Sequence, residues 1–349
     1  MTITVEPAPA EERFTSLPLR AEQEPDGKRP ITLRLSASDL LYRSTARTGG
    51  MIVLALMAMV GIFLGYRGVQ ALRVAGFSFL TTSAWEPDSG KFGIAAVMTG
   101  TLLIGLVAIT VAVPLSVGTA LYISEYAPRQ LKRTLVGMVD LMAAVPSVVY
   151  GLWGAYLFQD QAVYLARFLA AHLGWIPLFA VKGNDPTDPL SPLAIFTSST
   201  FIAGTVVGMM ITPVACSVMR EVFTQAPAGE REGAFALGAT RWGMIRSVVL
   251  PFGKGGIIGG SMLGLGRALG ETIAVAMIIS PVFAIQPHIL QNGANSVSAL
   301  IALRNGDAST MGISALMAAG LALFLMTLVV NFIASSIIAR SRSGASSDA

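Results

Sequence analysis

The sequence predicts an all-α integral membrane protein with six transmembrane helices. Hydrophobic residues make up 53% of the 349 residues and charged residues only 13%, a balance outside the usual range of soluble domains. Several uncharged apolar stretches reach about 20 residues, the length with which a helix crosses roughly 30 Å of hydrocarbon. A soluble protein would instead show shorter, periodic apolar runs.

Six stretches are apolar over the length of a span and carry few charges: residues 48–70, 93–115, 134–158, 193–217, 255–282 and 311–339. The apolar run from Phe92 to Tyr126 is too long for one crossing and too short for two. We therefore predict a break at Pro114, followed by a short interfacial helix that ends near Glu125 and Pro128.

The distribution of Lys and Arg predicts the orientation of the spans. Six spans place both termini on one side, and that side carries most of the Lys and Arg residues. Because basic residues are enriched in cytoplasmic loops, we predict that both termini are cytoplasmic. The same asymmetry accounts for the net charge of +4 without a nucleic-acid partner.

Cysteine and histidine indicate neither a disulfide nor a metal site. Cys216 is the single cysteine of the sequence, so no disulfide can form within the chain. His172 and His288 are isolated in sequence, and no metal-ligand spacing occurs. We therefore expect no metal in this chain.

The longest polar insert on the predicted cytoplasmic side is the loop of residues 220–256. From Glu232 onward it combines helix formers with three small residues, Gly233, Ala234 and Gly238. Small residues allow another surface to approach closely. We therefore expect a short amphipathic helix that is presented to a cytosolic partner, with a stop at Leu250-Pro251 before the next span.

Arg267 and Glu271 place opposite charges in the apolar, glycine-rich fifth span. Each charge costs about 2.5–3.5 kcal/mol near the bilayer centre, so neither is expected to face lipid. Being four residues apart, they can pair on one helix face. Two interpretations stay open: a structural ion pair, or an arginine that lines a translocation path and binds oxyanion oxygens while Glu271 orients it.

Glycines in the same span predict helix packing rather than nucleotide binding. Gly256, Gly260 and Gly264 follow a spacing of four on one helix face, and Gly270 continues the glycine-rich run. The segment "GLGRALG" breaks the GxGxxG spacing, and the chain has no GxxxxGK[ST] motif. We therefore expect no cofactor in this chain.

The cytoplasmic loop resembles the EAA loop of ABC importer permeases. The match comprises seven positions at fixed spacing: Glu232, Gly233, Ala234, Gly238, Val248, Leu250 and Pro251. Gly233 departs from the family's usual alanine, which costs about 1 kcal/mol of helix propensity. The resemblance implies that this loop, together with the adjacent Arg231, is a coupling helix seated in a groove of an ATPase subunit.

Three further segments are similar to phosphate importer permeases: "VPLSVGTALYISEYAP", "VPSVVYGLWG" and "GLGRALGETIAVAM". Two permease types pair in such importers, and Thr272 followed by Ile273 is similar to the PstC type, whereas the PstA type has Ala-Pro after its Gly-Glu-Thr. The resemblance implies a type I ABC importer permease fold. It also implies that Arg267, Glu271 and Thr272 line the substrate pathway.

Composition, apolar length and the resemblance together give a domain division. The divisions are a disordered tail at 1–45, which mixes acids, bases and prolines and is not covered by the resemblance, the first span and outer loop at 46–92, the permease core at 93–340 and a tail at 341–349. The resemblance also implies the partners: a second permease of the PstA type, two ATPase subunits of the PstB type that would bind ATP and Mg, and a phosphate-binding protein of the PstS type, in a bacterial inner membrane. The chain itself would catalyse no reaction.

Three alternatives stay open. The chain could be the PstA-type partner or a permease for another oxyanion, such as molybdate or sulfate. It could also be a secondary transporter, which would show inverted repeats and a coupling-ion site.

Overall fold

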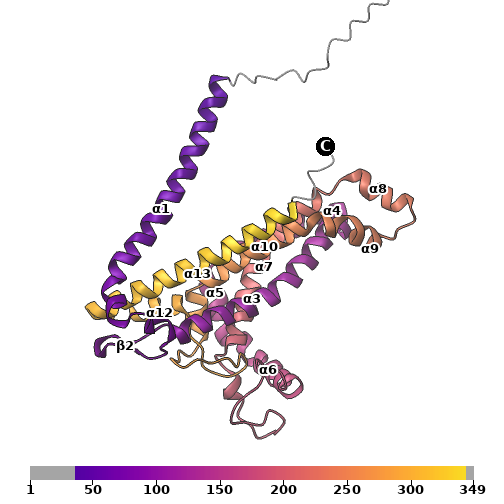
Figure 1. Cartoon of the computed structure of the whole chain (residues 1–349). Helices are drawn as coiled ribbons and strands as arrows, with labels where there is room; N and C mark the ends of the chain where they lie inside the picture. The colour runs from indigo at the N-terminus through magenta and orange to yellow at the C-terminus, as the bar shows by residue number, and fades with distance from the viewer. Residues whose placement is uncertain (1–35, 343–349) are drawn as a thin grey trace, which may run out of the picture. The chain divides into compact units, whose positions relative to one another are not determined.

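The computed structural model of the protein describes residues 36–342, and most of that range is helical (Figure 1). The chain divides into two compact units, residues 1–55 and 56–349. The predicted tails fall mostly outside the described residues, but residues 37–45 form the start of a helix rather than a tail. The described part of the first unit ends within that helix.

The helices are α1 (Ala37–Ala75), α2 (Ser78–Thr81), η1 (Pro87–Ser89), α3 (Ala95–Leu121), η2 (Tyr122–Tyr126), α4 (Arg129–Ala144), α5 (Ser147–Trp153), η3 (Gly154–Phe158), α6 (Gln159–Leu173), η4 (Leu193–Phe196), α7 (Thr200–Thr224), α8 (Ala228–Ala236), α9 (Arg241–Met244), η5 (Ile245–Val249), α10 (Leu250–Gly270), α11 (Ile273–Ile278), α12 (Val297–Arg304) and α13 (Thr310–Arg342). Of the short segments, η2, η3 and η5 are π-helical turns. Strands β1 (Trp85–Glu86) and β2 (Lys91–Phe92) pair antiparallel.

The spans agree in number with the prediction. Five helices are long and apolar enough to cross a membrane: Ser38–Ala75, Ala95–Tyr126, Thr200–Thr224, Arg241–Gly270 and Thr310–Ile337. A sixth candidate is the pair Arg129–Ala144 and Ser147–Leu173, which is bent by 87°. The prediction of an all-α protein with six spans is therefore confirmed when the bent pair is counted once.

Two of three proline positions differ from the prediction. The third span is bent at Pro146, where the sequence predicts a kink, because a proline holds the residue before it in an extended conformation. The break expected at Pro114 is absent, since α3 continues through it to Leu121. The stop expected at Leu250-Pro251 is also absent, because the helix runs from α9 through the π-helical turn η5 into α10 and includes Pro251.

The fifth span begins and ends earlier than predicted. We expected a continuous helix to residue 282, but α10 ends at Gly270 and Glu271 is extended, with ψ 125°. The short helix α11 follows from Ile273. The break therefore separates Arg267, in the last turn of α10, from Glu271 and Thr272.

The core of the second unit is built on α7, which packs along both α3 and α10. Gly208 of α7 lies so close to α3 that an added Cβ would stand 2.8 Å from the carbonyl oxygen of Ala108. Interiors this dense do not absorb an extra methyl group without moving the backbone. The close approach of the two helices therefore requires glycine at this position.

This packing gives a prediction for Gly208→Ala. The variant should lose about 1–3 kcal/mol of stability through overpacking, measured as a lower thermal unfolding midpoint in detergent. Gly118→Ala in α3 is the matched control, because an added Cβ there meets nothing within 4 Å. The control should unfold at the same or a slightly higher temperature, and equal midpoints for the two variants would contradict the packing argument.

Candidate functional site

A groove between α10 and α13 contains Arg267 and has a volume of about 530 Å³. Its lining residues are Met262, Leu263, Gly266, Arg267 and Gly270 of α10, and Gly320, Leu323, Phe324, Thr327 and Asn331 of α13. Arg267 and Asn331 are exposed, and Thr327 is half-buried. The groove is thus mostly apolar, with three polar side chains on two facing helices.

Gly266 brings Asn331 next to the turn that carries Arg267. A Cβ added at Gly266 would lie 3.5 Å from Oδ1 and 3.9 Å from Nδ2 of Asn331. Thr327, one turn earlier on α13, donates its hydroxyl proton to the carbonyl oxygen of Phe324 at 2.9 Å. The groove is therefore lined by a guanidinium group from α10 and an amide group from α13.

The expected ion pair between Arg267 and Glu271 does not form in residues 36–342. Because α10 ends at Gly270, the two side chains no longer share a helix face. The carboxylate of Glu271 instead accepts the amide proton of Ala274 at 3.2 Å and so caps α11. Thr272 donates its hydroxyl proton to the carbonyl oxygen of Gly270 at 3.1 Å.

Distant residues hold the break after Gly270 in place. Ser298 of α12 donates its hydroxyl proton to the carbonyl oxygen of Glu271 at 2.7 Å. Ser296 caps the same helix, and Thr101 of α3 accepts the amide proton of Val297 at 3.0 Å. The sequence analysis missed these residues. Ser296 directly before an apolar run is a pattern typical of a helix N-cap, whereas no sequence pattern indicates the contact between Val297 and Thr101 of α3.

The glycines of α10 divide between two faces. Gly256, Gly260 and Gly264 lie against α7, where added Cβ atoms would approach Val222, Ala215 and Ile211. Gly270, which we grouped with them for packing, has nothing within 4 Å of an added Cβ and lines the groove instead. The packed face fixes α10 on α7.

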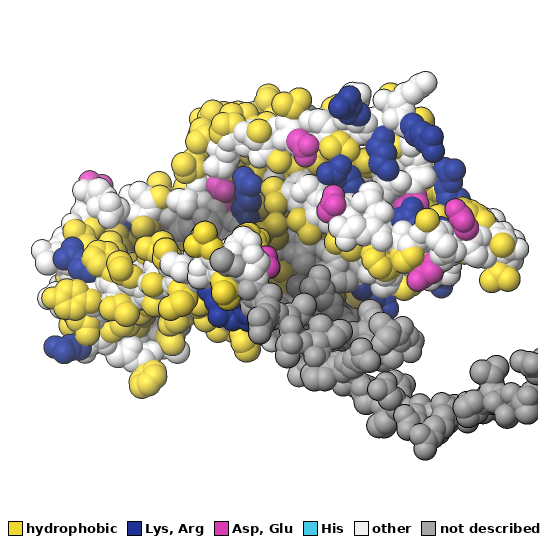
Figure 2. Space-filling model, turned by 90° about the horizontal axis from the view of Figure 1, so that it is seen from above, with side chains coloured by type: hydrophobic (Ala, Val, Ile, Leu, Met, Phe, Trp, Pro, Cys, Tyr) yellow, Lys and Arg dark blue, Asp and Glu magenta, His cyan; other side chains and the backbone are white. Residues whose placement is uncertain are grey.

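The predicted coupling helix is α8, which begins earlier than expected, at Ala228, and has no buried residue. Glu232, Gly233 and Gly238 are exposed, and Gly238 ends the segment with φ +82°. Figure 1 shows α8 and α9 between the end of α7 and the start of α10. In Figure 2, Lys and Arg side chains gather at the end where Figure 1 places α4, α8 and α9.

Arg231 points into the protein rather than outward from α8. Its Nη1 lies 3.2 Å from both carboxylate oxygens of Glu125 in η2, and Nη2 donates to the carbonyl oxygen of Phe223 at 2.6 Å. The Glu125 side chain is only 5% exposed. The guanidinium predicted to contact an ATPase is therefore occupied in tying α8 to the ends of α3 and α7. Leu250 and Pro251 likewise lie in α10, outside the exposed loop.

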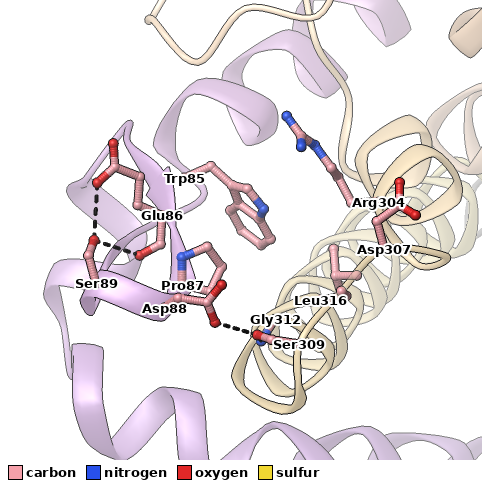
Figure 3. Close-up of a pocket in the computed structure, with 11 residues that line it drawn as sticks. Trp85, Glu86, Pro87, Asp88, Ser89, Arg304, Asp307, Ser309, Gly312 and Leu316 are labelled. Carbon is pink, nitrogen blue, oxygen red and sulfur yellow. Dashed lines mark hydrogen bonds between the residues drawn. The ribbon is translucent and has the colours of Figure 1, made fainter.

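A second cavity of about 400 Å³ lies between the β-hairpin and the loop before α13 (Figure 3). Asp88 accepts a hydrogen bond from Ser309 there, which joins the two segments. Trp85 stacks on Phe283, with 6.3 Å between ring centroids. Figure 1 places this hairpin at the opposite end of the second unit from α8.

Residues 112–343 match the family described as binding-protein-dependent transport system inner membrane component. The chain is 37% identical over 309 residues to the phosphate transport system permease protein PstC of Xylella fastidiosa (strain 9a5c), covering 88% of this chain and 93% of that protein. It is 39% identical over 303 residues to the PstC protein of Mycobacterium leprae (strain TN), covering 86% and 92%.

One solved structure shows the same fold. It is the crystal structure of a bacterial ABC transporter involved in the import of the acidic polysaccharide alginate, with a TM-score of 0.50 and 17% identity, covering 86% of this chain and 98% of that chain. At this identity the similarity is evidence for the fold alone. The family match and the two close relatives establish that this chain belongs to the binding-protein-dependent transport system inner membrane components.

Proposed function

We propose that this chain is a PstC-type permease subunit of an ATP-driven importer of inorganic phosphate. The observation that carries the proposal is the likeness over most of the chain to relatives named phosphate transport system permease protein PstC. Arg267 supports it, because a guanidinium group binds phosphate oxygens bidentately. Glu271 and Thr272 make hydrogen bonds at the break after Gly270 and in this way shape the end of the pathway.

The exposure of Arg267 implies a partner over the groove. A charge on a lipid-facing span costs about 2.5–3.5 kcal/mol, so the α10–α13 face is covered by protein or opens to water. A second permease of the PstA type would cover this face and complete the pathway. The anion then passes between the two permeases by alternating access.

The excess of Lys and Arg on one side of the sequence-predicted spans supports a cytoplasmic location for α8 and both termini. There α8 docks on an ATPase subunit of the PstB type, with Phe235 and Leu237 as exposed apolar contacts, 46% and 91% exposed. ATP and Mg are held by the two ATPase subunits. The β-hairpin end then faces outward and receives a PstS-type phosphate-binding protein.

A first prediction concerns Arg267→Gln in the complete importer, assembled in vesicles with its binding protein. Loss of a charged hydrogen-bond donor should lower labelled phosphate uptake at least about tenfold while the subunits still co-purify. Arg73→Gln, which removes an exposed charge in the last turn of α1 outside the groove, is the control. If Arg267→Gln takes up phosphate as fast as the control, Arg267 has no role in the pathway. If sulfate or molybdate inhibits the uptake as strongly as unlabelled phosphate does, the protein is an importer of another oxyanion.

A second prediction concerns the tie between α8 and η2. Arg231→Met leaves Glu125 buried without its partner, which should cost about 3–5 kcal/mol and detach α8. We expect ATP hydrolysis that no longer responds to the binding protein. The double variant Arg231→Met with Glu125→Gln should recover part of the thermal stability, and a double variant no more stable than Arg231→Met would argue against the ion pair.

A further inference from the structure

The α10–α13 groove holds a second polar group, the amide of Asn331, for which the anion-binding role of Arg267 gives no function. Asn331 is exposed on a span whose neighbouring residues Val329, Val330, Phe332 and Ile333 are apolar. An amide that faces lipid in this position would lose hydrogen bonds to water without replacement. The side chain therefore meets a polar partner in the assembled transporter.

The position of Asn331 identifies that partner. Gly266 leaves no side chain between α10 and the Asn331 amide, which lies beside the helical turn of Arg267. The groove of about 530 Å³ is large enough for a small anion between the two groups. The hydroxyl of Thr327 already donates to a carbonyl oxygen of its own helix. Of the three polar side chains of the groove, Asn331 therefore remains to bind the anion together with Arg267.

The chemistry of an amide differs from that of a guanidinium. Arg267 offers only donors, whereas Asn331 offers a donor at Nδ2 and an acceptor at Oδ1. Inorganic phosphate keeps at least one O–H group near neutral pH, while sulfate keeps none. An acceptor in the site therefore favours the protonated oxyanion, because sulfate would place an oxygen lone pair against Oδ1.

We propose that Asn331 is the second anion contact of this groove and that it selects protonated oxyanions over sulfate. The proposal rests on the transport function proposed above and adds its specificity-determining residue. Arg267 supplies the positive charge, and Oδ1 of Asn331 accepts a hydrogen bond from the O–H group of the bound anion.

The test uses the complete importer in vesicles, with Asn331→Leu, Asn331→Asp and the control Phe332→Leu, a residue that is 72% exposed and outside the groove. Labelled phosphate uptake is measured at saturating binding protein, with arsenate or sulfate enclosed in the vesicles as inhibitors. In the native importer, arsenate should inhibit and sulfate should not. Asn331→Leu should lower uptake about tenfold and remove the difference between the two inhibitors.

Asn331→Asp should lower uptake further, because a carboxylate repels the anion, while Phe332→Leu should behave as the native protein. Unchanged uptake and unchanged inhibitor preference in Asn331→Leu would overturn the inference. Failure of both Asn331 variants to co-purify with the other subunits would also overturn it and assign the residue to the permease interface. If Arg267→Gln abolishes uptake while Asn331→Leu changes neither uptake nor inhibitor preference, the transport proposal stands and only this inference fails.

Discussion

The constraint on which this structure depends is the cost of leaving polar groups without partners in hydrocarbon. The break after Gly270 leaves backbone groups without helical partners, and side chains bond to several of them: Ser298 donates to the carbonyl oxygen of Glu271, and the carboxylate of Glu271 accepts the amide proton of Ala274. Arg267 cannot face lipid either, so its groove has to be a covered or aqueous surface. The same constraint thus fixes both the helix break and the candidate pathway.

The α8 segment and the groove lie at the two ends of one helical span. The span that begins with α9 at Arg241 continues through η5 and α10 to Gly270, so its start follows α8 and its end carries Arg267. Arg231 holds α8 to Glu125 in η2. Between its two ends the span is held against α7, where three glycines keep the contact close.

Apolar length predicted the six spans, and small residues predicted α8, because both signals lie in neighbouring residues of the sequence. The errors come from contacts between distant residues. The end of α10 depends on Ser298, and the inward direction of Arg231 depends on Glu125, neither of which any local pattern indicates. The proline at position 114 was expected to break a helix that continues through it, since packing and the membrane setting outweigh local propensity.

The most direct test of the account is the water access of the α10–α13 groove. Gly270→Cys places a thiol in the groove with nothing within 4 Å of its Cβ, in a background where the buried Cys216 is replaced by serine. A charged thiol reagent reacts with thiolate in water but not with a thiol in lipid. The account predicts that the complete importer is labelled at Gly270→Cys, that phosphate-loaded binding protein with ATP slows the labelling, and that Leu328→Cys, outside the groove, stays unlabelled. No labelling at Gly270→Cys, or equal labelling at both positions, would contradict it.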